Sequence, residues 1–414
     1  MSSAGPRGLQ GVPEALQDRE SWLDPFDWYR RMREEAPVRY DPQRRTWDVF
    51  RYGDVKRVLD DDETFSVDPS EADDFEEPTE PGEGLILDTM LFEDPPRHDE
   101  LRGVVDDWFQ PRTLADRESH FRALAGELVD DAVDEDGEMD VVADLAYPFP
   151  VTVIAELLGI PPSDRDRFKQ WSDTLVAAAS DDEGAEEFTE RQQRSQMEMG
   201  QYFLEAIGDR RENPRDDLLS VIVTEETGSG GRLSHEEALG TCILLLVAGN
   251  ITTTNLIANA VRSFAEAEAE VDLFERLRGD DRALSGAVEE VLRYRSPVQA
   301  MSRVATEDVR MGDETVTAGD RVVVWLGSAN RDERAFDDPD AFRPDRSPTQ
   351  HLGFGHGTHY CLGAPLARLE AKVGLSELLD RVENVRLADA TLQPTRSSFV
   401  YGVESLPIRY DRRE

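Results

Sequence analysis

The sequence contains few lysines and few cysteines, and each shortage excludes a class of protein. Lysine occurs only at Lys56, Lys169 and Lys372, so arginine supplies the other 43 of the 46 basic side chains. The two cysteines, Cys242 and Cys361, can form one disulfide at most, which excludes a disulfide-stapled secreted scaffold and fits a reducing cytoplasm. Two cysteines also cannot hold an iron–sulfur cluster that needs four thiolates from this chain.

Long apolar runs are also absent. The longest unbroken one, Cys242–Ala248, is far shorter than the roughly 18 residues that a membrane span requires. The N-terminal segment Met1–Arg19 lacks the charged and then apolar pattern of a secretory signal. We therefore expect a soluble, cytoplasmic protein without a membrane span. The first residues are polar and contain glycine and proline, which predicts a loose arm over residues 1–20.

Acidic side chains dominate the charge. The 414 residues include 88 Asp and Glu against 46 Lys and Arg, which gives a net charge of −42. This charge repels nucleic acids and anionic membrane surfaces, so neither is an expected partner. Hydrophobic residues still make up 39% of the chain, too many for a disordered acidic tail. Because self-repulsion at this charge requires salt for screening, the composition predicts a halophilic protein from a salt-loaded cytoplasm.

The apolar pattern predicts a mainly helical protein. The clearest helix begins at a capping box of Ser234 and Glu237 and runs without proline to about Ala267. Its centre, Cys242–Ala248, is apolar on all faces, so we expect this helix to be buried and to cross the whole molecule. A second helix is expected over residues 283–295.

The β-structure is expected to be minor. A hairpin is predicted over residues 37–55, and short strands are predicted at 301–305 and 321–326. The Asp- and Pro-rich segment 332–346 is predicted to be irregular. No linker or repeat separates two cores. Residues 21–414 are therefore expected to form a single large, mainly α domain with a small β-sheet region.

The segment HLGFGHGTHYCLGAPLARLEAKV, residues 351–373, gathers chemically active side chains. It holds three of the six histidines, four glycines and Cys361. Glycines at this density allow the backbone to approach another group closely. A helix with Pro365 in its first turn is expected to follow. Cys361 would then lie at a helix N-terminus, where the dipole and free N–H groups lower the pKa of a thiol.

Several interpretations of this segment remain open from the residues themselves. His351, His356, His359 and Cys361 are candidate zinc ligands, although four ligands so close in sequence rarely enclose a tetrahedral ion. A cysteine nucleophile needs a base elsewhere in the chain, and no histidine is clearly placed to serve. A phosphate-binding loop lacks the required Gly-Lys-Ser/Thr. A glycine turn with a buried cysteine is the purely structural alternative.

The same segment contains a family signature. Phe354, Gly357, Cys361 and Gly363 in FGHGTHYCLG resemble the Phe-x-x-Gly-x-x-x-Cys-x-Gly signature of the cytochrome P450 family of haem-thiolate monooxygenases. The resemblance implies the cytochrome P450 fold and haem b as cofactor, with Cys361 as the axial ligand of the iron. A thiolate in that position donates charge to the iron. Phe354 would shield the sulfur from water, and Gly363 is assigned to the cofactor-binding residues.

Three further motifs resemble the same family in matching order and spacing, from about residue 20 to the C-terminus. Glu290 and Arg293 in EEVLR resemble its Glu-x-x-Arg helix motif, and Arg346 in FRPDR resembles the third member of its Glu-Arg-Arg triad. The segments 94–102 (DPPRHDELR) and 247–255 (VAGNITTTN) resemble two landmarks of its bacterial members. A Glu-x-x-Arg alone would indicate a solvated surface pair, whereas the resemblance implies a buried structural triad.

Haem carries two propionates, which a protein of this negative charge must hold with local cations. The resemblance assigns His98, Arg102, Arg303 and His359 to them. His98 and Arg102 are four residues apart near an expected helix start, so they share a face. Without the resemblance, each of the four would be interpreted as a surface residue.

The long apolar helix carries the residues that the resemblance assigns to oxygen. Ala248 and Gly249 would open space over the iron, and Thr252 would help to deliver protons. The family usually has Asp or Glu just before this threonine, whereas Ile251, preceded by Asn250, occupies the place here. Isoleucine cannot relay protons. A water chain held by Asn250 or the threonines, or a hydroxyl of the substrate, would have to replace it unless activation is slow.

The resemblance implies a monomeric monooxygenase that uses O2, an apolar small-molecule substrate and electrons from a separate ferredoxin-type donor. A peroxide-driven haem hydroxylase is an alternative that the missing acid favours. A haem-based binder or sensor without turnover is a third interpretation. Apolar substrate contacts are expected from four segments: Leu85–Phe92, Leu244–Ala248, Pro297–Ala300 and Phe399–Val400.

Overall fold

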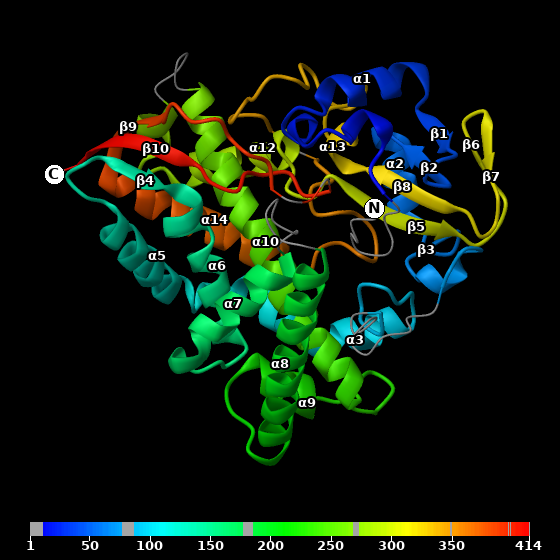
Figure 1. Ribbon diagram of the computed structural model, residues 1–414, viewed down its shortest axis with the longest axis horizontal. Helices are drawn as coiled ribbons and strands as arrows, with labels where there is room; N and C mark the ends of the chain where they lie inside the picture. Colours follow the sequence, from blue (N-terminus) through cyan, green and yellow to red (C-terminus); the bar gives the residue numbers. More distant parts are fainter. Residues whose placement is uncertain are drawn as a thin grey trace.

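The computed structural model describes residues 11–76, 87–176, 185–267, 273–347, 350–395, 397 and 399–413. Helices make up most of this described part of the chain (Figure 1). The α-helices are α1 (Phe26–Glu35), α2 (Tyr52–Asp60), α3 (Arg97–Val105), α4 (Pro111–Ala115), α5 (Glu118–Ala132), α6 (Pro148–Leu157), α7 (Arg165–Val176), α8 (Ala185–Glu212), α9 (Leu218–Thr224), α10 (His235–Ala267), α11 (Leu273–Leu277), α12 (Asp281–Tyr294), α13 (Leu326–Ala329) and α14 (Ala364–Arg381).

The strands of the described residues form three sheets. Their bounds are β1 (Val38–Asp41), β2 (Thr46–Val49), β3 (Phe65–Ser66), β4 (Glu138–Asp140), β5 (Ala300–Ala305), β6 (Val309–Met311), β7 (Glu314–Val316), β8 (Arg321–Trp325), β9 (Val382–Leu387) and β10 (Pro407–Arg412). The largest sheet has the order β1-β2-β8-β5-β3, in which only the β2–β8 pair is parallel. The other two sheets are β4-β10-β9 and the β6-β7 hairpin.

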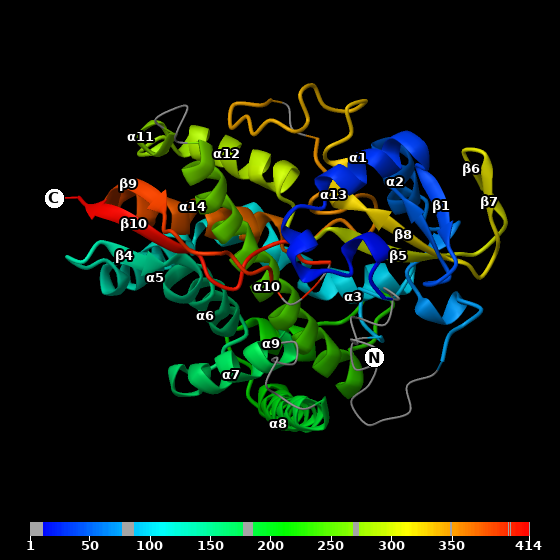
Figure 2. The same ribbon diagram turned by 45° about the horizontal axis from the view of Figure 1, so that its top comes forward.

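Helix α10 crosses the middle of the molecule (Figures 1 and 2). The predicted capping box begins it, because the Glu237 N–H donates to Ser234 Oγ at 3.0 Å and the Ser234 N–H donates to Glu237 Oε2 at 2.8 Å. Among the described residues it is the one helix that is long and apolar enough to span a membrane. However, 67% of its most apolar window is buried inside the protein, as expected for a core helix.

The remaining elements surround this helix on two sides. Helices α5, α6, α12 and α14 lie with the β4-β10-β9 sheet toward one end of the molecule, and the five-stranded sheet lies with α1 and α2 toward the other (Figure 2). Helices α6, α8, α12 and α14 all pack directly on α10. The predicted single domain, mainly helical with a small β region and a long central helix, is therefore confirmed.

Most of the predicted elements are present. The predicted hairpin is the β1–β2 pair, with Asp41 opposite Thr46 beside its turn, but the pattern beyond Arg51 belongs to α2. The predicted strands at 301–305 and 321–326 are β5 and β8, which pair antiparallel. The predicted helix over 283–295 is α12.

The predicted N-terminal arm needs a correction. Residues 1–10 lie outside the described residues, but residues 11–20 are not loose. They form a 3₁₀ turn at Glu14–Leu16 and begin a second one, Arg19–Leu23. Leu16 is only 2% exposed, and Arg19 Nη2 lies 2.7 Å from Glu404 Oε1. Burial of one leucine and a long-range ion pair hold this segment to the core, which its polar composition did not indicate.

Candidate functional site

The loop before α14 presents Cys361 on a tightly turned backbone. The Cys361 N–H donates to the Phe354 carbonyl at 2.9 Å, and the Tyr360 N–H donates to the Gly357 carbonyl at 3.0 Å. Gly355 and Gly357 have φ values of 73° and 71°, a region that favours glycine. A Cβ on Gly357 would lie 2.6 Å from the Leu59 carbonyl oxygen. The loop therefore requires glycine both for its turn and for its contact with the end of α2.

The surroundings of the Cys361 thiol act on its pKa in opposite directions. Burial is the largest influence and raises its pKa, although the N–H of Gly363, the guanidinium groups of Arg102 and Arg368, and the N–H of Ala364 act in the opposite direction. The expected lowering of the pKa at the helix N-terminus is therefore wrong for the protein alone. Cys361 is half-buried. A thiol of raised pKa reacts poorly, whereas a bound metal cation deprotonates it outright.

A second group of contacts covers Phe354, which is 8% exposed. The Arg368 guanidinium carbon lies 4.5 Å from the centroid of its ring, and Arg368 also binds Glu289 through two hydrogen bonds of 2.6 and 3.0 Å. His351 Nε2 lies 3.1 Å from the same carboxylate. Burial by itself would raise the pKa of Glu289, but its bonds with His351 and Arg368 outweigh burial and lower it to about 2.

Glu289 and Arg368 were missed by sequence reasoning. Glu289 stands directly before the motif glutamate Glu290 and has no signature of its own. The available signal was weak: Arg368 is a positive side chain on the helix that follows the cysteine. Only the packing of α12 against α14 brings the two residues together.

A cluster of basic side chains lies between α3, β5 and the cysteine loop. The rings of His98 and His359 lie 4.3 Å apart between centroids. His359 Nε2 is buried and has no hydrogen-bond partner among the described residues, because the nearest carboxylate oxygen, on Asp94, is 3.9 Å away. An unsatisfied buried nitrogen of this kind marks a place where a polar ligand is expected.

Arg303 completes this group. Its side chain is buried, and its hydrogen bond within the described residues goes to the Ser302 carbonyl at 2.8 Å. Burial lowers the pKa of Arg303 to about 10, against the effects of Asp94 and Asp62. The guanidinium therefore remains charged at neutral pH without a carboxylate in ion-pair contact in the described part of the chain. In a protein of net charge −42, this is a prepared site for an anion.

Arg102 contacts the cysteine loop. It donates to the Tyr360 carbonyl at 2.8 Å, and its Nε lies 3.5 Å from Asp106 Oδ1. Its predicted contact with a propionate stays a prediction.

The triad residues lie in one buried network. Arg293 binds both oxygens of Glu290 at 2.8 Å, and Arg346 Nε lies 3.1 Å from Glu290 Oε2. The Glu290 and Arg293 side chains are fully buried. The other guanidinium N–H groups donate to carbonyls at positions 337, 338, 339 and 341, within the irregular stretch, and at position 330 just before it. The network therefore fastens this stretch to α12.

The centre of α10 has one accessible face in an otherwise buried segment. Ala248 is exposed, and Gly249 and Thr252 are half-buried, whereas most residues on either side are buried. The Thr252 hydroxyl donates to the Ala248 carbonyl at 2.8 Å. Asn250 is fully buried and accepts a hydrogen bond from Thr254 at 3.3 Å. Since residues two apart on a helix point roughly 200° apart, Asn250 and Thr252 face different directions.

Two of the predicted substrate segments lie side by side. Val298 and Val400 form an antiparallel bridge, and the Gln299 N–H donates to the Phe399 carbonyl at 2.8 Å. Of the segment Leu85–Phe92, residues 85 and 86 lie outside the described residues, and Leu91 is 44% exposed.

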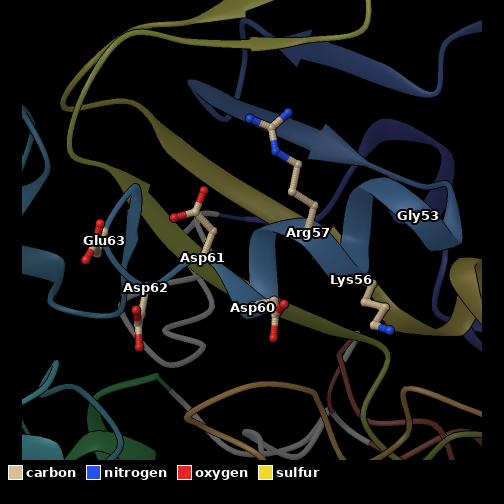
Figure 3. Close-up of a pocket in the computed structure, with 7 residues that line it drawn as sticks. All are labelled: Gly53, Lys56, Arg57, Asp60, Asp61, Asp62 and Glu63. Atoms are coloured by element: carbon tan, nitrogen blue, oxygen red, sulfur yellow. The ribbon is translucent and has the colours of Figure 1, made fainter.

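A surface hollow of about 510 Å³ lies beside the cysteine loop (Figure 3). His356 Nε2 lies 3.5 Å from Asp60 Oδ1, and the Thr358 hydroxyl donates to Asp62 at 2.6 Å. The charged lining does not suit an apolar substrate. It consists of Gly53, Lys56, Arg57, Asp60, Asp61, Asp62 and Glu63.

Known proteins match both the sequence and the fold. A profile of the family described as Cytochrome P450 matches residues 282–400. Cytochrome P450 109 from Bacillus spizizenii is 40% identical over 99% of this chain and 97% of its own length. Erythromycin C-12 hydroxylase from Saccharopolyspora erythraea is 42% identical over 86% of each chain. The crystal structure of CYP109E1 from Bacillus megaterium in complex with corticosterone has a TM-score of 0.83 and 41% identity, covering 94% of this chain and 99% of that chain.

This chain belongs to the cytochrome P450 family. It is therefore a P450 monooxygenase, an oxidoreductase, and its cofactor is haem b. The site fits this group: Cys361 would ligate the iron, and the unsatisfied His359 nitrogen, His98 and the unpaired Arg303 would hold the propionates. When bound, the haem supplies the redox chemistry of oxygen insertion.

The zinc interpretation of the cysteine segment does not fit this P450. Among the described residues, no group of three or more His, Cys, Asp or Glu side chains could hold a metal ion. The candidate zinc ligands instead have separate partners, since His351 pairs with Glu289 and His356 with Asp60.

Proposed function

We propose that this P450 inserts one oxygen atom from O2 into an apolar small molecule, with electrons from a separate ferredoxin-type donor. The observation that carries the proposal is the accessible face of α10 at Ala248, in a chain that also presents the half-buried Cys361 and the buried Arg303. The two cysteines of the chain exclude an internal cluster of four cysteines, so the electrons come from another protein. The relative crystallised with corticosterone supports a substrate of steroid-like size and polarity.

Each residue of the central face has a role in this proposal. Ala248 and Gly249 would leave room for the haem and its substrate, since among the described residues a Cβ on Gly249 would come near only Ile154, at 4.0 Å. To pass a proton from its Oγ1, the Thr252 hydroxyl turns away from the Ala248 carbonyl, because it has one hydrogen to donate, and it takes up another proton at the same oxygen. Asn250 is turned toward Thr254 and away from Thr252, so in this proposal it supports the helix.

Spectroscopy of the holoenzyme tests the haem assignment first. Carbon monoxide added to the reduced protein should give the red-shifted band that names the family, and Cys361→Ser should abolish it. Corticosterone and other apolar compounds should then be screened for shifts of the haem spectrum, with products identified by mass. An unchanged band in Cys361→Ser would overturn the axial-ligand assignment.

Thr252→Ala tests the proton-delivery role. We expect O2 consumption to continue while product per O2 falls about tenfold or more, the contribution typical of a proton-transfer group. Thr224→Ala is the matched control, because Thr224 makes the same kind of bond, to the Ser220 carbonyl at 2.7 Å, in α9. Unchanged coupling in Thr252→Ala contradicts the role.

Peroxide-driven hydroxylation is the second candidate, and Ile251 is the observation that favours it. Isoleucine in place of the family's acid removes one proton source for O2 activation, which peroxide does not need. Product formation with peroxide alone, faster than with O2 and a reduced ferredoxin, would establish this alternative.

We also propose that the protein works as a monomer in a salt-rich cytoplasm. The net charge of −42 and the scarcity of lysine support the salt-rich compartment. Sedimentation equilibrium in high salt should give the mass of one chain, 46.6 kDa plus haem.

A further inference from the structure

A positive side chain on α14 lies against the cysteine loop, and the function described so far does not use it. Arg368 stacks on Phe354, with its guanidinium carbon 4.5 Å from the ring centroid, and it donates to the Tyr360 hydroxyl at 3.1 Å. Both partners belong to the loop that presents Cys361, because the Cys361 N–H donates to the Phe354 carbonyl and Tyr360 directly precedes Cys361. The Arg368 side chain is 35% exposed, so solvent screens its charge only in part.

Glu289 on α12 holds the guanidinium in this position. It accepts hydrogen bonds from Arg368 Nε at 2.6 Å and from Nη2 at 3.0 Å, a paired geometry that the planar fork of arginine allows and lysine does not. Burial by itself would raise the pKa of Glu289, but the bonds with His351 and Arg368 lower it to about 2. Glu289 therefore stays negative throughout the ordinary pH range.

His351 fixes the other side of this carboxylate. Its Nδ1 lies 3.1 Å from the backbone nitrogen of Gly353, whose N–H can only donate, so Nδ1 is an acceptor. The ring proton is therefore on Nε2, which donates to Glu289 at 3.1 Å. The carboxylate is held on both sides and cannot turn away from Arg368 without losing the bond to His351.

The two charges of this pair are not placed equally around Cys361. Arg368 contacts two residues of the cysteine loop, whereas the hydrogen bonds of Glu289 described above go to Arg368 and His351. Burial raises the pKa of the Cys361 thiol, and the Arg368 guanidinium is among the groups that oppose this effect. A cation that favours a thiolate also favours an electron added to a metal bound by that thiolate, because both carry negative charge.

We propose that Arg368 sets the reduction potential of the haem, and that Glu289 is the positioning residue that holds this guanidinium and partly offsets its charge. This inference rests on ligation of the iron by Cys361, which is part of the proposed function. The step concerned is the transfer of one electron from an external donor to the ferric iron, in which no bond of the protein forms or breaks. The fixed cation favours the ferrous form, and the carboxylate behind it disfavours that form.

The reduction potential of the holoenzyme tests this assignment in a titration with redox dyes that follows the haem spectrum. In Arg368→Gln we expect the ratio of ferrous to ferric haem at a fixed potential to fall about tenfold, a shift of about 59 mV for one electron. In Glu289→Gln the opposing charge is removed while the amide oxygen still accepts from Arg368, so the ratio should rise. Arg368→Lys keeps a positive charge and should lie between the wild type and Arg368→Gln.

The signs of these shifts separate an electrostatic role from mechanical support. Arg368→Gln and Glu289→Gln both weaken the same pair of hydrogen bonds, so a purely structural role would move the potential in one direction in both variants. Shifts of the same sign, or an unchanged potential in Arg368→Gln, overturn the inference. A potential of Arg368→Lys no higher than that of Arg368→Gln overturns it as well.

Arg122→Gln is the matched control. The Arg122 side chain is 36% exposed and, like Arg368, pairs with a carboxylate at a helix contact of α14, since its Nη1 lies 3.0 Å from Glu377 Oε1. Its other described hydrogen bonds go to Glu118 and Ser376 and not to the cysteine loop. The potential of Arg122→Gln should equal that of the wild type. A fall as large as that of Arg368→Gln would overturn the specific role of Arg368.

The carbon monoxide spectrum distinguishes this inference from the ligand assignment on which it rests. A reduced wild type without the red-shifted band overturns ligation by Cys361 and with it the proposed function. A wild type with the band, but with variants whose potentials do not shift as stated, overturns only the role of Arg368. If Arg368→Gln fails to bind haem, Glu289→Gln decides the matter, because an unchanged or lowered potential in that variant contradicts the inference.

Discussion

At the scale of single residues, Arg303 shows that a prepared binding site can lower the stability of the protein without its ligand. Its guanidinium is desolvated, and in the described part of the chain it has no carboxylate within ion-pair distance. A buried charge without a partner is unfavourable, so the protein without haem carries a destabilising group. The propionates would offset this unfavourable burial, because a hydrogen bond between charged groups contributes more free energy than one between neutral groups.

Arg303→Met should therefore have opposite effects on the two forms of the protein. We expect the apoprotein to become more stable by about 1–3 kcal/mol, because a buried charge is replaced by an apolar chain of similar length. Haem should be lost roughly tenfold faster, since about 1.5 kcal/mol of charged hydrogen bonding is removed. Thermal unfolding of the apoprotein and haem transfer to an excess of apomyoglobin measure the two effects. If Arg303→Met raised or lowered both the stability of the apoprotein and the retention of haem, Arg303 would not act on the propionates.

Gly357 tests the backbone of the cysteine loop. Gly357→Ala places a Cβ 2.6 Å from the Leu59 carbonyl at a φ of 71°, so we expect a loss of at least about 1–2 kcal/mol in the free energy of unfolding. Gly53→Ala is the control, because a Cβ there meets nothing within 4 Å and Gly53 lies in helix α2. It should be stabilising by about 0.5–1 kcal/mol. Denaturant unfolding compares them, and equal effects would contradict the assignment of strain to Gly357.

At the scale of elements, the Glu290–Arg293–Arg346 network replaces regular structure as the support of the stretch 332–346. This stretch has little ladder or helix hydrogen bonding, so its carbonyls accept from the two guanidinium groups instead. The planar fork of arginine makes several such bonds at once, which the point charge of a lysine does not.

Arg293→Met removes one partner and leaves Glu290 buried without it. We expect a loss of about 3–5 kcal/mol in the free energy of unfolding, together with poor haem incorporation. Arg30→Ala is the control, because its pairs with Asp27 and Asp340 are 46% exposed on the arginine side and should be worth less than about 1 kcal/mol. Denaturant titration of both variants decides the matter. A similarly small loss of unfolding free energy in both variants would show that the network contributes no more to stability than an exposed ion pair.

The packing of α14 on α10 has its own pH dependence. The pKa of Glu370 is raised to about 8 from 4.5, so its contribution to stability is fully present below pH 4.5 and is lost as the pH rises through about 8. Relative to Glu370→Gln, the wild type should therefore lose a few kcal/mol over this range, about 1.4 kcal/mol for each pH unit that separates the unfolded and folded pKa values. Unfolding of both proteins from pH 5 to 9 gives this difference. A constant difference would mean that the folded-state pKa is not raised.

At the scale of the whole molecule, the charge is the dominant property. With a net charge of −42, the surface repels itself unless ions screen it. Raising the ionic strength from about 0.1 to 1 M shortens the screening length from roughly 10 to 3 Å. Many acidic groups still pair with arginine, as Asp130 does with Arg381, but exposed pairs of this kind contribute little.

We therefore expect potassium chloride to stabilise the holoenzyme. Its melting temperature should rise by at least several degrees between 0.1 and 1 M salt, since a few kcal/mol correspond to such a change in a chain of this size. A neutral osmolyte at equal osmolality is the control and should produce a smaller rise. Differential scanning calorimetry measures both. A melting temperature that is independent of salt would contradict the halophilic interpretation.

Local sequence patterns predicted many of the elements and site residues of this protein. The Ser234–Glu237 capping box marks where α10 begins, because a helix start depends on residues only three apart. The turn around Cys361 was predictable for the same reason, since Gly355 and Gly357 impose it locally. The triad was found through a motif within one helix plus a resemblance that supplied Arg346. The same local reasoning failed for residues 11–20, where burial of Leu16 depends on a distant partner surface.

Tertiary structure alone decided which charges are paired and which are left unpaired. The composition shows an excess of acid, but only packing sets Glu289 against Arg368, buries Arg303 beyond ion-pair distance of the carboxylates in the described residues, and places Glu370 against Thr253. The reason is physical. The protonation and pairing of a side chain depend on desolvation and on neighbours within a few ångströms, and those neighbours come from helices that are far apart along the chain.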